Sequence, residues 1–271
     1  MDNFSVLLSV YYKENPKYLE ESLNSIFVQT IRPNEVILVE DGELTDELYL
    51  TIAKFEKKYK NIFKVVKYKE NRGLGVALHD GLLECSNEIV FRMDTDDICL
   101  PYRFEKQLNI FKNNDVDVVG GNIKEFDEGM LNETSMRIVP ESDENIKKMM
   151  KKRNPLNHMT VAYKKSKVLE AGNYKDMLYF EDYYLWARMA KKGCIFRNVQ
   201  EILVNVRGGN DMIKRRGGKK YIKPIIRFEK ELLKLKIISR IEYLNNTLIR
   251  VFSALIPNSI RSILYKKALR K

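Results

Sequence analysis

The chain has 271 residues and a hydrophobic content of 44%, enough for one large domain with a core of its own. Its three cysteines are odd in number and far apart, which argues against a disulfide framework or a zinc site and favours a reducing compartment. The first apolar run is too short for a signal peptide, and no apolar stretch reaches the roughly 18 residues of a transmembrane helix, so neither is expected.

The formal net charge of +11 comes from one end of the chain. Residues 211–271 contain 17 Lys and Arg against 4 Asp and Glu, a net charge of +13, so residues 1–210 carry a net charge of −2. A local basic surface is typical of proteins that bind nucleic acid, anionic lipid or a phosphorylated ligand. Because no nucleic-acid-binding motif or aromatic–basic platform is visible, nucleic acid is not expected among the partners.

Strands and helices alternate along the first third of the chain. Short apolar, β-branched runs predict strands at 4–12, 35–42, 62–70 and 87–94. Apolar residues at helical spacing predict helices between them, at 15–30, 43–59 and 75–86. This alternation is typical of βαβ units, so the expected fold class is α/β: a Rossmann-like, mostly parallel sheet with helices on both faces.

The pattern is looser after Pro101. It predicts a helix at 101–114, a strand at 116–126, a polar loop at 127–145, a strand at 158–165 and a helix at 179–193. From about residue 220 onward the sequence predicts basic, amphipathic helices.

Polar turns follow three of the predicted strands, at 40–42, 71–73 and 94–97. In open α/β sheets, ligands bind beyond the carboxyl ends of the strands. An Asp-rich turn can simply cap a helix, but Asp94, Asp96 and Asp97 are more carboxylates than a cap needs. Hard oxygen ligands suit Mg²⁺ or Mn²⁺, so the last turn predicts a metal site. No GxGxxG and no P-loop motif is present, which argues against a dinucleotide site.

A second acidic pair, Glu181 and Asp182, begins the predicted helix at 179–193 among aromatic residues. Acidic residues at this position can simply favour the helix dipole. A carboxylate in apolar surroundings is also a better proton acceptor, which suits a general base. His158 is one of two histidines, and its spacing alone is compatible with a structural role.

The segments VILVEDG, NRGLGVALHDGL, FRMDTDDICLPYRFEKQ and YFEDYYLWARM, in this order, resemble family 2 glycosyltransferases with the GT-A fold. The resemblance covers Phe4 to about residue 217. With NPLNHMTV and LVNVRGGNDMIKRR, it is closest to bacterial O-antigen and exopolysaccharide enzymes of the amylovoran type. Several such relatives transfer glucose or galactose from a UDP-sugar to GlcNAc-diphosphoundecaprenol in a β1,3 linkage. The resemblance implies an inverting hexosyltransferase that uses Mn²⁺ or Mg²⁺.

The resemblance also implies roles for individual residues. Asp96 would bind the metal, with Asp94 contacting metal or ribose, and Asp97 would lie behind them or cap a helix. Asp182 would be the general base, supported by Glu181. The expected substrate-binding residues are Tyr11, Glu14, Asp41 (which would hold the uracil), Asn71, Gly73, Asp94, His158 and Arg207.

Two departures from the family pattern leave details open. His79 stands where many relatives have Asn or Arg, and NDMIKRR replaces a segment that carries a histidine in many relatives. Arg207, Arg215 or Arg216 could grip phosphate there, or Asp211 could ligate the metal.

The expected domains are a glycosyltransferase domain at 1–217, with a nucleotide-sugar half (1–100) and an acceptor half (101–217), and a basic helical segment at 218–271. Apolar residues of that segment follow helical spacing at Ile237, Ile238, Ile241, Leu244, Leu248 and Val251, and again at Ile260, Ile263 and Leu264. These helices either pack on the domain or lie on an anionic inner leaflet. An undecaprenyl-diphosphate acceptor favours the second reading, a peripheral protein at the cytoplasmic face of the bacterial inner membrane.

Three alternatives remain at this point. One is a non-catalytic nucleotide-sugar or lipid-binding module. The intact acidic motifs argue against it. Another is a transferase with a different donor sugar or acceptor. A nucleotidyltransferase would normally carry a glycine-rich first loop, and SVYYKENP lacks the glycines.

Overall fold

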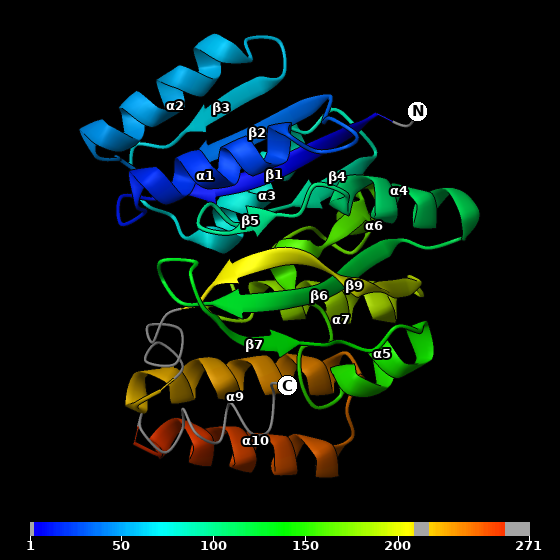
Figure 1. Ribbon diagram of the computed structural model, residues 1–271. Helices are drawn as coiled ribbons and strands as arrows, with labels where there is room; N and C mark the ends of the chain where they lie inside the picture. The colour runs from blue at the N-terminus through cyan, green and yellow to red at the C-terminus, as the bar shows by residue number, and fades with distance from the viewer. Residues whose placement is uncertain (1–2, 209–216, 258–271) are drawn as a thin grey trace.

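A computed structural model describes residues 3–208 and 217–257 (Figure 1). Its sheet has nine strands in the order β3-β2-β1-β4-β8-β6-β9-β5, with β7 paired to β6 outside this path. The strands are β1 (Phe4–Val10), β2 (Glu35–Glu40), β3 (Phe63–Lys67), β4 (Ile89–Arg92), β5 (Ile98–Cys99), β6 (Val118–Phe126), β7 (Glu133–Arg137), β8 (Ala162–Lys164) and β9 (Phe196–Arg207).

The first four strands form the parallel half of the sheet. β1 pairs in parallel with both β2 and β4, and β2 pairs in parallel with β3. β8 then runs antiparallel between β4 and β6, and β6 pairs in parallel with β9. The predicted α/β class with a mostly parallel sheet is therefore confirmed, and the carboxyl ends of β1, β2 and β4 lie at one edge.

Helices cover both faces of the sheet, and the side chains of the strands alternate accordingly. Leu7, Ile37 and Val90 join a core cluster with α3, α5, α6, α7 and α9. Their chain neighbours Leu8 and Phe91 join a second cluster with α1, α2 and α4. The helices are α1 (Pro16–Phe27), α2 (Asp46–Lys58), α3 (Leu74–Glu84), α4 (Arg103–Asn113), α5 (Asp143–Met150), α6 (Lys165–Glu170), α7 (Glu181–Lys191), α9 (Lys219–Lys234) and α10 (Arg240–Leu255).

The predicted loop at 127–145 is wrong, because it contains strand β7 and the start of α5. β7 reads ETSMR, which has none of the apolar alternation that marks a strand in sequence. It forms because β6 offers it a free edge, with which it pairs antiparallel. The predicted strand at 158–165 is also shorter than expected, since a 3₁₀ turn, η1 (His158–Thr160), precedes β8. Strand β9 had no sequence prediction.

The pair of helices α9 and α10, here called the C-terminal hairpin, lies at the end of the molecule opposite β3 (Figure 1). Its inner helix α9 packs on the start of α7: Phe228 stacks on Phe180 with ring centroids 4.5 Å apart, and Tyr221 stacks on the same ring at 5.7 Å. A buried ion pair of 2.7 Å between Glu229 and Arg250 joins the two helices. The hairpin thus shares a core cluster with the sheet and its helices.

The two faces of α10 differ in what they contact. Val251 and Ala254 pack toward the core, as do Ile237 and Ile238 in the turn before the helix. Ile241, Leu244 and Leu248, which were expected on the same stripe, are exposed, together with Ile249, Phe252 and Leu255. The predicted apolar positions at 260–264 lie outside the described residues.

Cys85, Cys99 and Cys194 are all buried free thiols. Over the ranges 3–208 and 217–257, no helix is both long enough and apolar enough to cross a bilayer.

Candidate active site

The acidic loop, residues 94–97, connects β4 to β5 at the edge where the parallel strands end. Carboxylate oxygens of Asp94, Asp96 and Asp97 all lie within 4.8 Å of one another. Three oxygen ligands at this spacing, two of them partly exposed, fit a hard divalent cation. The donor set of the protein is therefore chemically suited to the Mg²⁺ or Mn²⁺ expected from the sequence.

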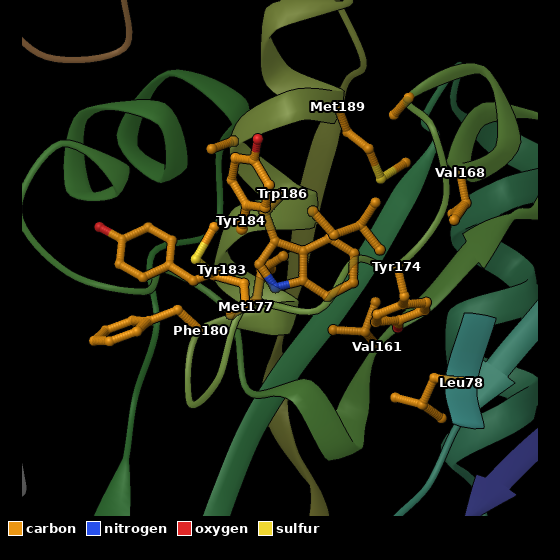
Figure 2. Close-up of a cluster of buried hydrophobic side chains, with 14 of the residues drawn as sticks. Leu78, Val161, Val168, Tyr174, Met177, Phe180, Tyr183, Tyr184, Trp186 and Met189 are labelled. Atoms are coloured by element: carbon orange, nitrogen blue, oxygen red, sulfur yellow. The ribbon is translucent and has the colours of Figure 1, made fainter. Parts of the chain in front are cut away.

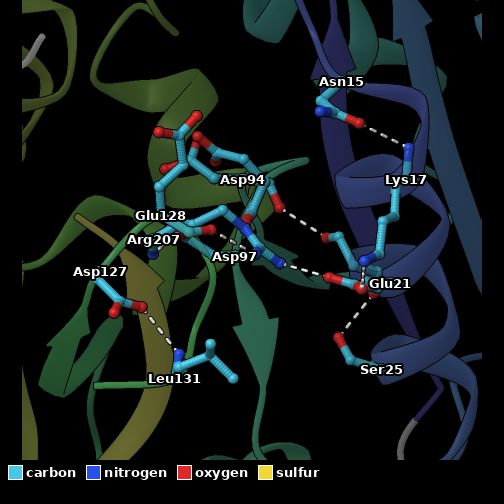
Figure 3. A network of polar contacts seen from close by, with 12 residues as sticks. Asn15, Lys17, Glu21, Ser25, Asp94, Asp97, Asp127, Glu128, Leu131 and Arg207 are labelled. Carbon is cyan, nitrogen blue, oxygen red and sulfur yellow. Dashed lines mark hydrogen bonds and ion pairs between the residues drawn. The ribbon is translucent and has the colours of Figure 1, made fainter. Parts of the chain in front are cut away.

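Arg207, at the end of β9, holds the acidic loop in place (Figure 3). Its backbone N–H donates to Asp97 Oδ1 (2.9 Å), and its Nε donates to the carbonyl of Asp96 (2.8 Å). Its Nη1 and Nη2 donate to the Glu128 carbonyl (3.0 Å) and to Glu21 Oε2 (2.5 Å). Since each guanidinium nitrogen already has a partner within the chain, Arg207 holds the acidic loop through its bonds to Asp96 and Asp97. Asp97 is not a helix cap, because α4 begins later, with Tyr102 as its N-cap.

The close packing of the carboxylates changes their acidity in the protein without metal. Burial, and then the negative charges of Asp94 and Glu14, raise the pKa of Asp96 to about 7. Burial, and then the charges of Asp96 and Asp94, also raise the pKa of Asp97 well above its usual value. The ionised form of such a cluster is disfavoured, and a bound divalent cation would favour it.

Glu14 joins this cluster from the turn after β1. Its Oε2 accepts a hydrogen bond from the Thr95 hydroxyl (2.6 Å), and burial raises its pKa. Tyr11, in the same turn, is 38% exposed and leaves an aromatic face open to solvent. The structure therefore brings Glu14 to the acidic loop, while Tyr11 lines the rim of the same sheet edge.

The two other polar turns are bonded directly to each other. Asp41 accepts hydrogen bonds from the backbone N–H groups of Arg72 (2.7 Å) and Gly73 (3.0 Å) through separate oxygens. The Asn71 side chain donates to the Asp41 carbonyl (3.0 Å). Gly42 has a φ of +92°, and a Cβ there would lie 2.7 Å from the Asn71 nitrogen, so only glycine permits this approach. The turns at 40–42 and 71–73 thus lie against each other.

Glu181 and Asp182 begin α7, whose next residues Tyr183, Tyr184 and Trp186 belong to a buried aromatic layer (Figure 2). Burial, and then the charge of Asp182, raise the pKa of Glu181 to about 7. Asp182 Oδ2 accepts a hydrogen bond of 2.6 Å from the Asn154 side chain, and its Oδ1 accepts one from the Tyr183 N–H. The pair lies against the start of α3, since the Glu181 Cβ is 3.4 Å from the position that a Cβ on Gly75 would take. The aromatic side chains of this layer are Tyr174, Phe180, Tyr183, Tyr184 and Trp186.

His158 contacts two residues of this layer. Its Nε2 is 3.0 Å from the Tyr174 hydroxyl, and its ring meets Trp186 edge to face at 6.0 Å. Burial, and then the positive charge of Arg92, lower its pKa well below the usual range, so the ring is neutral. These contacts match the structural reading of His158. His79 pairs with Asp80 at 2.8 Å.

Sequence reasoning missed Asn154 as the partner of Asp182 and Arg92 as the ion-pair partner of Asp94. The only available signals were a polar residue before Pro155 and a charge inside an apolar strand. Asp211, Arg215 and Arg216 lie outside the described residues.

Solved structures share this fold. Staphylococcus aureus TarS, residues 1–349 in complex with UDP-GlcNAc, superposes with a TM-score of 0.69 at 19% identity, covering 98% of this chain and 76% of that one. A Pyrobaculum calidifontis mannosyltransferase in complex with GDP-Man and Mn²⁺ gives a TM-score of 0.64 at 14% identity, covering 98% and 75%. The fold is therefore that of the GT-A class of transferases.

The sequence identifies the family. Residues 5–170 match glycosyl transferase family 2. The chain is 38% identical over 269 residues to the Escherichia coli UDP-Gal:alpha-D-GlcNAc-diphosphoundecaprenol beta-1,3-galactosyltransferase, covering 99% of this chain and 97% of the relative. It is 38% identical over 265 residues to the Erwinia amylovora amylovoran biosynthesis glycosyltransferase AmsE, covering 97% and 98%. The chain belongs to glycosyl transferase family 2 and is a glycosyltransferase, as the sequence predicted.

Proposed function

We propose that this enzyme transfers galactose or glucose from a UDP-sugar to GlcNAc-diphosphoundecaprenol, forming a β1,3 bond with inversion. The observation that carries the proposal is the cluster of Asp94, Asp96 and Asp97, whose carboxylate oxygens lie within 4.8 Å of one another in the loop between β4 and β5. The names of the relatives from Escherichia coli and Erwinia amylovora supply the substrate class, a repeat unit of O-antigen or exopolysaccharide.

The nucleotide half of the site is assigned to the turns after β1, β2 and β3. Asp41, Asn71 and Gly73 form one fixed unit, which suits recognition of a uracil and its ribose. Asp41 keeps lone pairs for a ligand, because each carboxylate oxygen can accept two hydrogen bonds. Tyr11 and Glu14 would complete this half from the rim of the sheet.

Asp96 and Asp94 would hold a divalent cation, Mn²⁺ or Mg²⁺. When bound, that cation offsets the charge that develops on the UDP leaving group. Arg207 is assigned to holding the acidic loop, and His158 to supporting the aromatic layer, because both already have partners within the chain.

Asp182 is assigned as the general base. An acceptor hydroxyl is a weak nucleophile near neutral pH, so a carboxylate must take its proton during attack. The hydrogen bond from Asn154 fixes the direction of the Asp182 carboxylate, and Glu181 adds a second negative charge beside it. Attack from the face opposite UDP then inverts the anomeric centre without a covalent enzyme intermediate.

The test is a donor screen with a synthetic GlcNAc-diphosphate-lipid acceptor and linkage analysis of the product. We expect transfer from UDP-Gal or UDP-Glc that stops in excess EDTA. Asp96→Asn and Asp182→Asn should each lower kcat by at least about 100-fold. Full activity of both variants would refute the assigned roles. Binding of UDP with no turnover across all donors and acceptors would favour the non-catalytic module.

The C-terminal hairpin is proposed to hold the enzyme on the anionic inner leaflet of the bacterial cytoplasmic membrane. Side chains on one face of α10 are between 53% and 72% exposed, namely Ile241, Leu244, Leu248, Ile249, Phe252 and Leu255. Residues 211–271 carry a net charge of +13. An exposed apolar stripe in a basic segment suits the interface of an anionic bilayer, whereas a second copy of this segment would bring like charges together.

Flotation with vesicles that contain phosphatidylglycerol tests this proposal. The triple variant Leu244→Ser, Leu248→Ser and Phe252→Ser should lose most vesicle binding. A matched control, with Leu50→Ser, Leu83→Ser and Leu131→Ser at exposed positions elsewhere, should bind like the wild type. Equal binding of both variants would refute the assignment of the α10 face.

A further inference from the structure

Arg92 is a charged residue at the end of a buried strand. β4 reads IVFR, and all four residues are buried. The Arg92 backbone lies inside the sheet, opposite Leu7 of β1, with its N–H bonded to the Val161 carbonyl at 2.8 Å. Its side chain is 3% exposed, and its Nη2 forms an ion pair with Asp94 Oδ1. The chain thus places a buried guanidinium group in contact with the first residue of the acidic loop.

This guanidinium is only partly satisfied by the protein. Its Nε and Nη1 are buried and have no hydrogen-bond partner among the described residues. Two other buried arginines have more of their guanidinium nitrogens in hydrogen bonds. Arg103 donates from Nε, Nη1 and Nη2 to Gln107, Met93 and a backbone carbonyl. Arg188 donates from Nη1 and Nη2 to the carbonyls of Ala171 and Asn173, so that of its three nitrogens only Nε has no partner among the described residues.

A buried cation with unfilled donors costs folding free energy, so packing alone does not account for Arg92. Its positive charge acts on Asp94, Asp96, Asp97 and Glu181, the carboxylates of both halves of the site. Arg92 is therefore a buried cation that the fold pairs with the acidic loop through Asp94.

We propose that Arg92 is a positioning residue that fixes the Asp94 carboxylate for the divalent cation of the donor complex. This inference rests on the proposed metal site. Asp94 is 31% exposed at its side chain, and the ion pair with Arg92 restricts its rotation while one oxygen stays available toward the loop. Residues that orient a ligating carboxylate affect metal affinity although they never touch the metal.

Two physical effects of removing Arg92 have opposite signs. Loss of a positive charge beside the site would, by Coulomb's law alone, strengthen the binding of a cation. Loss of the hydrogen-bonded orientation of Asp94 would weaken it, by about 10- to 100-fold for comparable carboxylate partners. The direction of the change in affinity therefore separates a positioning role from simple charge balance.

The experiment measures binding of Mn²⁺ to the full chain in the presence of UDP, from the electron paramagnetic resonance signal of free Mn²⁺. We expect Arg92→Met to bind Mn²⁺ at least about 10-fold more weakly than the wild type. Arg92→Lys should recover part of the loss, since its ammonium group can still donate to Asp94 although it lacks the planar fork. The control is Arg188→Met, which removes a buried guanidinium bonded to carbonyls and should leave Mn²⁺ affinity unchanged.

A double-variant comparison keeps the proposal testable even where Arg92→Met folds poorly. If Arg92 acts through Asp94, Arg92→Lys should change Mn²⁺ affinity in the wild type but not in an Asp94→Asn background. Unchanged or tighter Mn²⁺ binding by the Arg92 variants would overturn the positioning role alone. Failure of the wild type to bind Mn²⁺ with UDP would overturn the proposed metal site together with it.

Discussion

Glu181 is the carboxylate through which pH should act on stability near neutrality. Its folded-state pKa is raised from 4.5 to about 7, chiefly by burial. As pH rises from about 4.5 to 7, the unfolded chain ionises at this position first, so the folded state loses relative stability. Glu181→Gln has no charge to bury. We therefore expect the variant to gain stability over the wild type by about 2 kcal/mol more at pH 8 than at pH 5.

Urea unfolding of both proteins at pH 5 and pH 8, without divalent cations, measures this difference. A stability difference that does not change with pH would mean that Glu181 is ionised throughout and that solvent reaches it freely. The same variant retains Asp182 and its hydrogen bond from Asn154, so the proposed base stays in place.

The residues of the site were predictable to different degrees. Asp41, Asn71, Gly73 and the acidic loop could be assigned to one edge because parallel strands place their carboxyl ends together. Asn154 could not be paired with Asp182, since that contact joins segments 28 residues apart through the fold of the acceptor half. Arg207 was expected to bind substrate, and its hydrogen bonds to the Asp96 carbonyl, the Glu128 carbonyl and Glu21 could not be read from the sequence.

At the scale of elements, the contact between the two glycine-containing turns gives a sharp test. Gly42→Ala would place a methyl group 2.7 Å from the Asn71 backbone nitrogen at a φ of +92°. We expect a loss of about 3 kcal/mol in unfolding free energy and weaker UDP binding, because the turn at 71–73 must move.

Gly193→Ala is the matched control. Gly193 has a similar φ of +86°, but nothing lies within 4 Å of its added Cβ. Its substitution should cost only about 1 kcal/mol for the backbone conformation and leave UDP affinity unchanged. Equal effects of the two substitutions would show that the approach of Asn71 does not matter.

Helices and strands with an apolar periodicity of their own were predictable from the sequence. Strands that form only by pairing with a neighbouring strand were not. α1, α2 and β1 to β4 carry apolar patterns that fix their type without the rest of the molecule. β7 is polar and depends on the edge of β6 for its backbone partners. β5 has two residues and exists only where it meets β9. Tertiary pairing decides such strands, so their sequences carry little signal.

At the scale of the whole molecule, the C-terminal hairpin should unfold together with the domain on which it packs. Phe228 is fully buried and stacks on Phe180, next to the Glu181–Asp182 pair. We expect Phe228→Ala to cost about 3–5 kcal/mol and to lower the midpoint of a single thermal transition that both parts share. Differential scanning calorimetry, together with intrinsic tyrosine fluorescence, measures the midpoint and the number of transitions.

Leu248→Ala on the exposed face of α10 is the control, and it should change stability by no more than about 0.5 kcal/mol. Two separate transitions, with only the smaller one shifted by Phe228→Ala, would instead support the expected division at 217/218 into independent units.

The three buried thiols have a practical consequence for measuring local opening. Burial raises the pKa of Cys85 to about 12 and that of Cys194 to about 11, and it also raises the pKa of Cys99. The thiolate is the nucleophile that attacks an alkylating reagent, so each buried thiol can react only when the surrounding segment opens. Cys99 lies beside the acidic loop, Cys85 follows α3 and Cys194 follows α7. Pulsed alkylation read out by mass spectrometry would therefore give three separate opening rates from the unmodified protein, and UDP with Mn²⁺ should slow the rate at Cys99 most.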